Sequence, residues 1–126
     1  MPKDKAKILI IEDDQDQINM YRFKFENEGF EFLSARNGKD GLRTAKTARP
    51  DLILLDLVLI NENGVEVMEK LKANPETKAI PVMILTNLAK KSMEQRSKEL
   101  GSVDFIIKTQ ISPSGLVKKV RDAINQ

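Results

Sequence analysis

The sequence contains neither cysteine nor histidine among its 126 residues. The absence of cysteine excludes disulfide bonds, zinc–thiolate sites and cysteine nucleophiles. The absence of histidine excludes histidine-based catalytic triads and most zinc or non-haem iron sites. Whatever chemistry the chain performs must therefore use carboxylates, lysine or hydroxyl groups.

An excess of one charge and a long hydrophobic run are also missing. The 21 Lys and Arg nearly balance the 19 Asp and Glu, and the net charge of +2 does not indicate a nucleic-acid partner. The longest apolar runs, residues 52–55 and 57–60, are separated by Asp56 and fall far short of the roughly 20 residues that span a membrane. Since the chain does not open with a basic segment followed by an apolar one, we expect no export signal and a cytoplasmic protein with no membrane partner.

What remains is the composition of an ordinary globular protein, with 40% hydrophobic and 32% charged residues. Because a domain usually has about 100–200 residues, we expect one domain over residues 1–126, with its core at about residues 6–125.

Short apolar segments alternate with longer amphipathic ones along the chain. We expect strands at residues 8–11, 30–35, 52–56, 81–86 and 103–107, and a loop at residues 57–63. We expect helices from Ile18 to a stop at Gly29, at residues 37–49, 65–74 and 90–100, and from Pro113 onwards with Ser112 as N-cap. Five strands alternating with five helices predict a doubly wound α/β fold, in which helices cover both faces of a parallel sheet.

Polar side chains stand just past the ends of the most buried strands: Glu12, Asp13, Asp56, Thr86 and Lys108. Doubly wound sheets bind ligands at the carboxyl ends of their strands, so we expect these side chains to converge. Taken alone, each has an ordinary role as a turn former, a helix cap, a β-forming residue or a solvated lysine. Three carboxylates close together would raise one another's pKa unless a cation neutralised them.

The chemistry of this cluster suits Mg²⁺, which prefers oxygen ligands and accepts one or two carboxylates, here Asp13 and Asp56. A nucleophilic Asp can form an acyl phosphate, and Mg²⁺, Lys108 and Thr86 could position and neutralise the phosphoryl group. The sequence has no GxxxxGKS/T or GxGxxG motif, which argues against a nucleotide as phosphodonor. A small or protein-borne phosphodonor is left.

Five features in order carry a resemblance to a known family over nearly the whole chain. They are ILIIEDD at residues 8–14, PDLILLD at 50–56, Gly64 eight residues after Asp56, PVMILT at 81–86 and DFIIK at 104–108. In these features the sequence resembles a stand-alone receiver domain of bacterial two-component response regulators. The resemblance implies the flavodoxin-like strand order 2-1-3-4-5. It also implies a non-enzymatic signalling regulator in which Asp56 accepts a phosphoryl group from a partner's phosphohistidine.

The resemblance also assigns roles to single residues. It implies that Asp13 binds Mg²⁺ (or Mn²⁺) directly alongside Asp56, that Glu12 holds a metal-bound water, and that the backbone carbonyl of Val58 completes the protein ligands. Thr86 and Lys108 would each contact a phosphoryl oxygen. Phe105 stands at the family's rotating aromatic position, where its inward turn follows the movement of Thr86; the alternative is a plain core aromatic.

Three positions depart from the family pattern. Ile60 and Thr109 stand where the family often has Pro, and Asn87 replaces a smaller residue. We expect a less rigid loop around Ile60 and narrower access beside Asn87. A cis bond before Thr109 would cost about 3–4 kcal/mol, so either the bond is trans and Lys108 is aimed differently, or the site stores that strain.

Val58 and Leu88 occupy positions that, in this family, influence attack of water on the acyl phosphate. Both are apolar and can neither orient water by hydrogen bonding nor act as a base, so we predict slow self-dephosphorylation.

The expected partners are a sensor histidine kinase or histidine phosphotransfer protein, docking near residues 15–18 and 110–111, and a downstream protein target. We expect no output domain after the last helix, and therefore action by binding. The expected surface is the face formed by the fourth helix, fifth strand and fifth helix, in a monomer or a phosphorylation-dependent homodimer. One alternative is a receiver-like interaction module that acts without phosphorylation. Another, an aspartate-nucleophile phosphatase, would usually need a second Asp where Val58 stands.

Overall fold

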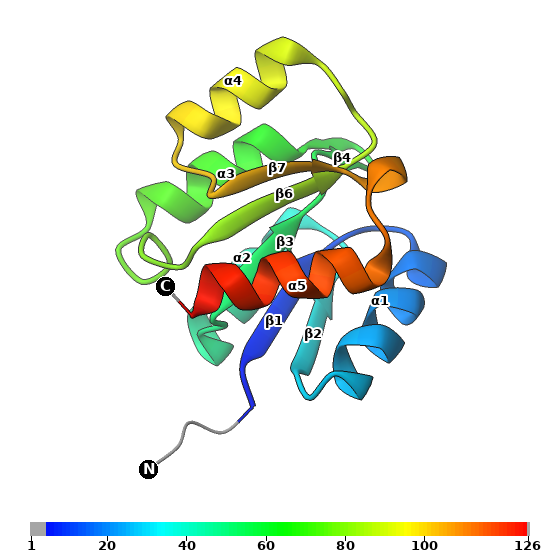
Figure 1. The fold of residues 1–126 in the computed structure, drawn as a ribbon. Helices are drawn as coiled ribbons and strands as arrows, with labels where there is room; N and C mark the ends of the chain where they lie inside the picture. Colours follow the sequence, from blue (N-terminus) through cyan, green and yellow to red (C-terminus); the bar gives the residue numbers. More distant parts are fainter. Residues whose placement is uncertain (1–4, 126) are drawn as a thin grey trace.

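The computed structural model describes residues 5–125 and has a central sheet of five parallel strands (Figure 1). The strands are β1 (Lys7–Ile11), β2 (Glu31–Ala35), β3 (Leu52–Leu55), β6 (Val82–Thr86) and β7 (Asp104–Ile107), and they lie in the order β2-β1-β3-β6-β7. In chain order this is 2-1-3-4-5, which confirms the predicted fold class. The strands β1, β3 and β6 are almost entirely buried, because helices cover both faces of the sheet.

Five helices form the two outer layers: α1 (Gln15–Asn27), α2 (Gly38–Ala48), α3 (Gly64–Ala73), α4 (Lys91–Glu99) and α5 (Pro113–Ile124). The helices α1 and α5 lie on one face of the sheet, and α2, α3 and α4 lie on the other (Figure 1). On the first face, the predicted stripe of Ile18, Tyr21 and Phe25 packs with Leu116 and Val120 of α5. None of the helices in residues 5–125 is long and apolar enough to cross a membrane.

Side chains cap α2 and α5 at the predicted points. Asn37 accepts a hydrogen bond from the backbone N–H of Asp40, and Ser112 accepts one from that of Gly115. In the described chain, the N-cap of α4, Lys90, makes no side-chain hydrogen bond to the helix, and Ser97 is the only fully buried residue of α4. The helix α4 is therefore held by fewer local interactions than its neighbours.

The prediction of a plain loop at residues 57–63 is wrong, because this segment contains a small hairpin. Its strands are β4 (Val58–Leu59) and β5 (Glu62–Asn63), and at the tip Asn61 takes the left-handed conformation with φ of 57°. The hairpin closes against Gly64, whose N–H donates to the carbonyl of Leu57 at 3.0 Å. A Cβ at Gly64 would lie 2.4 Å from the Cα of Leu57, so only glycine fits there.

A short 3₁₀ helix, η1 (Lys108–Gln110), follows β7 and was not predicted. Residues 5–125 contain no cis peptide bond, so the bond between Lys108 and Thr109 is trans.

The strand β7 forms one edge of the sheet, where only its β6 side is paired. The N–H of Phe105 donates to the carboxylate of the preceding residue, Asp104, at 2.8 Å. Lys119 of α5 donates to the other oxygen of the same carboxylate at 3.4 Å. The carboxylate of Asp104 thus accepts one of the backbone N–H groups along the unpaired edge of β7.

Candidate functional site

The carboxyl ends of four strands meet at one cavity. Glu12 and Asp13 follow β1, Asp56 follows β3, Thr86 ends β6 and Lys108 follows β7. The cavity has a volume of about 340 Å³ and is lined by Glu12, Asp13, Asp14, Gln17, Asp56, Val58, Asn87, Leu88 and Lys108. Thr86 is fully buried beside it and contacts Asp56. The structure therefore brings together all five predicted strand-end residues.

The carboxylate of Asp56 is held by three hydrogen bonds. Its Oδ1 accepts from the hydroxyl of Thr86 at 2.8 Å and from the N–H of Val58 at 2.9 Å. Its Oδ2 accepts from the ammonium of Lys108 at 2.7 Å. Because this side chain is only 8% exposed, these groups fix its orientation while one side still faces the cavity.

Lys108 links Asp56 to Glu12. Its ammonium donates to Oδ2 of Asp56, to Oε1 of Glu12 and, at 2.6 Å, to the side-chain oxygen of Gln17. The expectation that a trans bond would aim Lys108 differently is wrong, because Lys108 reaches Asp56 with a trans bond.

The electrostatics of this group follow from burial and pairing. Burial opposes the charge of Lys108, but hydrogen bonds and charges from Asp56 and Glu12 outweigh it and raise the pKa of Lys108. Burial raises the pKa of Glu12 to about 7, although Lys108 and the N–H of Asp14 act to lower it. Burial likewise raises the pKa of Tyr21, and the charges of Lys108, Glu12 and Asp56 affect this pKa as well.

Asp13 faces the hairpin rather than Lys108. Its Oδ2 accepts from the N–H of Ile60 at 2.6 Å, and its backbone carbonyl accepts two hydrogen bonds from Arg36, at 2.9 and 3.2 Å. Although Glu12, Asp13 and Asp56 line one cavity, no three acidic residues within residues 5–125 are gathered as a metal site. The donors themselves are hard oxygen ligands, which fit a cation such as Mg²⁺.

The remaining predicted residues lie around this centre. The side chain of Val58 is exposed and lines the cavity, and the N–H of Leu88 donates to the hydroxyl of Thr86 at 3.2 Å. Asn87 is exposed at the cavity wall. Phe105 is half-buried and packs against the core cluster beneath α2, α3 and α4, an arrangement compatible with a core aromatic. Its switch role stays a prediction.

Sequence reasoning missed three contributors: Gln17, Arg36 and the N–H of Ile60. Gln17 lies in the first turn of α1, and its position just after the acidic strand end is a signal that could have identified it. Arg36 follows β2 directly and could have been included as a further strand-end residue. Every residue except proline has a backbone N–H, so the role of the Ile60 N–H as a donor to Asp13 could not be predicted from the sequence.

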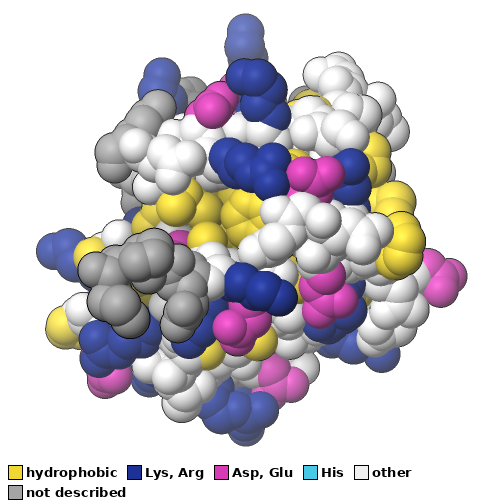
Figure 2. All heavy atoms as spheres, turned by 60° about the horizontal axis from the view of Figure 1, so that its bottom comes forward, with side chains coloured by type: hydrophobic (Ala, Val, Ile, Leu, Met, Phe, Trp, Pro, Cys, Tyr) yellow, Lys and Arg dark blue, Asp and Glu magenta, His cyan; other side chains and the backbone are white. Residues whose placement is uncertain are grey.

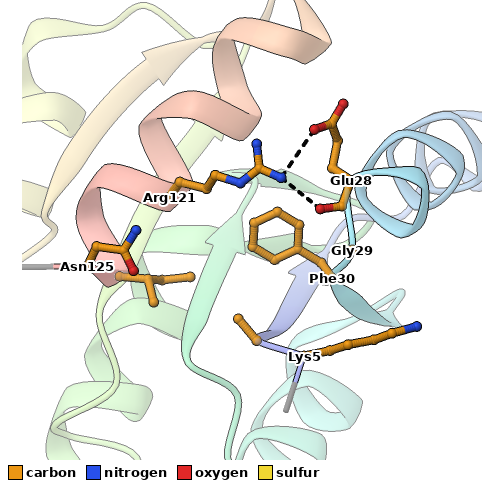
Figure 3. A pocket seen from close by; sticks show the side chains of 8 residues that line it. Lys5, Glu28, Gly29, Phe30, Arg121 and Asn125 are labelled. Atoms are coloured by element: carbon orange, nitrogen blue, oxygen red, sulfur yellow. Dashed lines mark hydrogen bonds and ion pairs between the residues drawn. The ribbon is translucent and has the colours of Figure 1, made fainter. Parts of the chain in front are cut away.

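A second cavity of the same volume lies at the opposite end of the sheet, beside the starts of β1 and β2. Figure 2, with that end turned forward, shows hydrophobic side chains surrounded by charged ones. Arg121 lies 5.3 Å from the ring centre of Phe30 and donates to the backbone carbonyl and carboxylate of Glu28 (Figure 3). The charges of Arg121 and Glu28 neutralise each other. The cavity lined by Glu12, Asp13 and Asp56 therefore remains the candidate site.

The strand order and the position of the cavity define a doubly wound, flavodoxin-like protein with an acidic pocket at its topological switch point. Residues 8–121 match the family model of the response regulator receiver domain. The chain is 37% identical to the polar-differentiation response regulator DivK of Brucella anthropi over 108 residues, covering 86% of this chain and 85% of DivK. It is 33% identical to protein PilH of Pseudomonas aeruginosa over 103 residues, covering 82% and 85% of the two chains.

The fold also matches the crystal structure of the chemotaxis protein CheY4 of Vibrio cholerae, with a TM-score of 0.86 at 24% identity, over 94% of this chain and 98% of that one. The chain therefore belongs to the response regulator receiver domain family of two-component systems. Members of this family are signalling proteins rather than enzymes in the ordinary sense, and they generally bind Mg²⁺ at their acidic phosphorylation site.

Proposed function

We propose that the chain is a phosphoacceptor switch of a two-component phosphorelay, in which Asp56 receives a phosphoryl group from the phosphohistidine of a sensor kinase or histidine phosphotransfer protein. The observation that carries this proposal is the placement of the Asp56 carboxylate in an open cavity between a lysine and a hydroxyl group. We further propose that the exchange takes place in the cytoplasm.

In this reaction a carboxylate oxygen of Asp56 attacks phosphorus while the phosphorus–nitrogen bond of the donor breaks. The leaving imidazole keeps the electron pair of that bond and takes up a proton, and Asp56 becomes an acyl phosphate. The ammonium of Lys108, 2.7 Å from Oδ2, is placed to neutralise a phosphoryl oxygen. The hydroxyl of Thr86, 2.8 Å from Oδ1, is placed to donate to another.

We propose that Asp13, Asp56 and the backbone carbonyl of Val58 hold Mg²⁺ or Mn²⁺ directly, and that Glu12 holds a metal-bound water. When bound, the cation supplies positive charge that offsets the charge of the phosphoryl group. Until then, Lys108 is the counter-ion of Glu12 and Asp56. Of the two carboxylate oxygens of Asp13, Oδ2 accepts the N–H of Ile60.

The proposed output is a change on the face formed by α4, β7 and α5. The hydroxyl of Thr86 joins the site to the segment before α4, because it accepts the N–H of Leu88. If the hydroxyl of Thr86 turns toward a phosphoryl oxygen, its hydrogen bond from the N–H of Leu88 has to break. The ring of Phe105 can then move inward after Thr86. The few fully buried residues of α4 favour movement there. A downstream protein or a second phosphorylated copy would bind the altered face.

The first test is to treat the chain with acetyl phosphate and Mg²⁺ and to map the acid-labile phosphate. We expect one modified residue, Asp56, and no modification of Asp56→Asn or of the chain in EDTA. Asp51→Asn is the matched control, because Asp51 lies at the other end of β3 and should not affect labelling. Labelling of another residue, or of none, would overturn the proposal.

The second test separates the switch from an interaction module that acts without phosphorylation. Beryllofluoride with Mg²⁺ imitates the acyl phosphate, and a switch should respond with shifted backbone amide signals in α4, β7 and α5. An unchanged amide spectrum would favour the interaction module.

A further inference from the structure

The carboxylate of Asp13 is already engaged by the neighbouring hairpin. Its Oδ2 accepts the backbone N–H of Ile60 at 2.6 Å, across 47 positions of the sequence. Glu12 and Asp56, which line the same cavity, are paired instead with Lys108. Asp13 is thus held by a donor that neither Glu12 nor Asp56 uses.

The hairpin presents this N–H in a fixed position. Ile60 and Asn61 form the tip between β4 and β5, and the backbone of the tip turns through the left-handed Asn61. On the β5 side, the carboxylate of Glu62 accepts the N–H of Gly38 at the start of α2 at 2.6 Å. A carboxylate at the start of a helix is stabilised by the helix dipole, so Glu62 holds the hairpin in place.

From these contacts we propose that the N–H of Ile60 competes with the divalent cation for the carboxylate of Asp13 and so lowers the metal affinity of the site. This inference rests on the proposed function, because it takes Asp13 as a metal ligand. A hydrogen bond to a charged acceptor is among the stronger ones, and on this proposal the carboxylate of Asp13 gives it up when it binds the cation. Cation binding would therefore free the tip of the hairpin.

The decisive variant is Ile60→Pro, which removes the N–H and keeps a residue suited to this position. Proline is favoured at the first central position of a turn whose second central residue has positive φ, as Asn61 has. The side chain of Ile60 is 70% exposed, so its replacement disturbs little packing. Ile60→Ala is the matched control, because it shortens the same side chain but retains the N–H.

We expect Ile60→Pro to bind Mg²⁺ about three- to tenfold more tightly than the parent chain in isothermal titration calorimetry, and Ile60→Ala to bind like the parent. If the parent binds Mg²⁺ and Ile60→Pro binds no more tightly than Ile60→Ala, the competition is refuted and the metal site stands. If none of the three chains binds Mg²⁺, the inference and the proposed metal site both fail.

A second measurement needs no variant and decides the matter even if Ile60→Pro does not fold. Hydrogen exchange of the Ile60 amide, followed by NMR, should be slow in EDTA and become faster when Mg²⁺ saturates the site. The amide of Gly38, held by Glu62, should keep its exchange rate. Equal or slower exchange of Ile60 with Mg²⁺ would overturn the proposal.

Discussion

Replacing Lys108 with Met in the metal-free protein should reveal how strongly the two buried acids depend on one counter-ion. The side chains of Lys108, Glu12 and Asp56 are 8%, 2% and 8% exposed. Loss of one partner of a buried ion pair costs about 3–5 kcal/mol, because the other charge is left without compensation. Since Asp56 keeps its hydrogen bonds from Val58 and Thr86, we expect a loss near the lower end, about 3 kcal/mol.

The loss should also depend on pH. Lys108 lowers the pKa of Glu12, so its removal lets burial raise that pKa further above 7. A folded-state pKa above the ordinary 4.5 gives stability that is present below about pH 4.5 and lost as the pH rises through the folded-state value. Near pH 5 Glu12 holds a proton in both chains, whereas near pH 8 the variant must either keep that proton on Glu12 or bury its charge without Lys108. The destabilisation should therefore be larger near pH 8.

The assay is urea unfolding followed by far-ultraviolet circular dichroism in EDTA, with equal m-values for the two chains. Adding Asp56→Asn to the Lys108→Met chain should recover stability, because it removes one of the two unpaired charges. A loss below about 1 kcal/mol near pH 8 would be typical of a surface ion pair and would refute the reasoning. So would a double variant no more stable than Lys108→Met alone.

Three other predictions concern the metal, the lifetime of the phosphate and the hairpin. Mg²⁺ at 100 times its Kd should stabilise the chain by about 2.7 kcal/mol in urea unfolding, and Asp13→Ala should abolish the gain; equal gains would exclude Asp13 as a ligand. Loss of labelled phosphate should take longer than seconds, and Leu88→Glu should accelerate it by about tenfold or more; no acceleration would count against control by Leu88. Gly64→Ala should cost about 2 kcal/mol or more, since its Cβ would lie 2.4 Å from the Cα of Leu57, whereas Gly115→Ala should change stability by less than about 1 kcal/mol.

The strand ends were the part of the site that the sequence could predict. Each buried strand is a continuous apolar run, and the polar residue that ends it has to emerge at the carboxyl edge of the sheet. Alternating strands and helices predict a parallel sheet, and the strand order that the resemblance implies places Asp56 and Lys108 at the same end of it, although 52 positions separate them. This is why five scattered residues could be assigned to one cavity.

The contacts that orient these side chains could not be predicted in the same way. The small hairpin depends on the left-handed Asn61 and the close approach of Gly64 to Leu57, which no periodicity signals. In α2, Gly38 and Gly41 have low helix propensity, yet a Cβ at Gly41 would lie 2.5 Å from the side chain of Ile11. Tight packing against β1, rather than helix propensity, accounts for that glycine.

The protected donor on β7 bears on how two copies of this chain could associate. An open edge strand normally invites another strand to continue the sheet, through rows of unpaired backbone groups. Here Asp104 occupies the N–H of Phe105, and a strand added at this edge would have to displace that carboxylate and its contact with Lys119. Continuation of the sheet by a second copy at this edge therefore carries the cost of breaking both of these contacts.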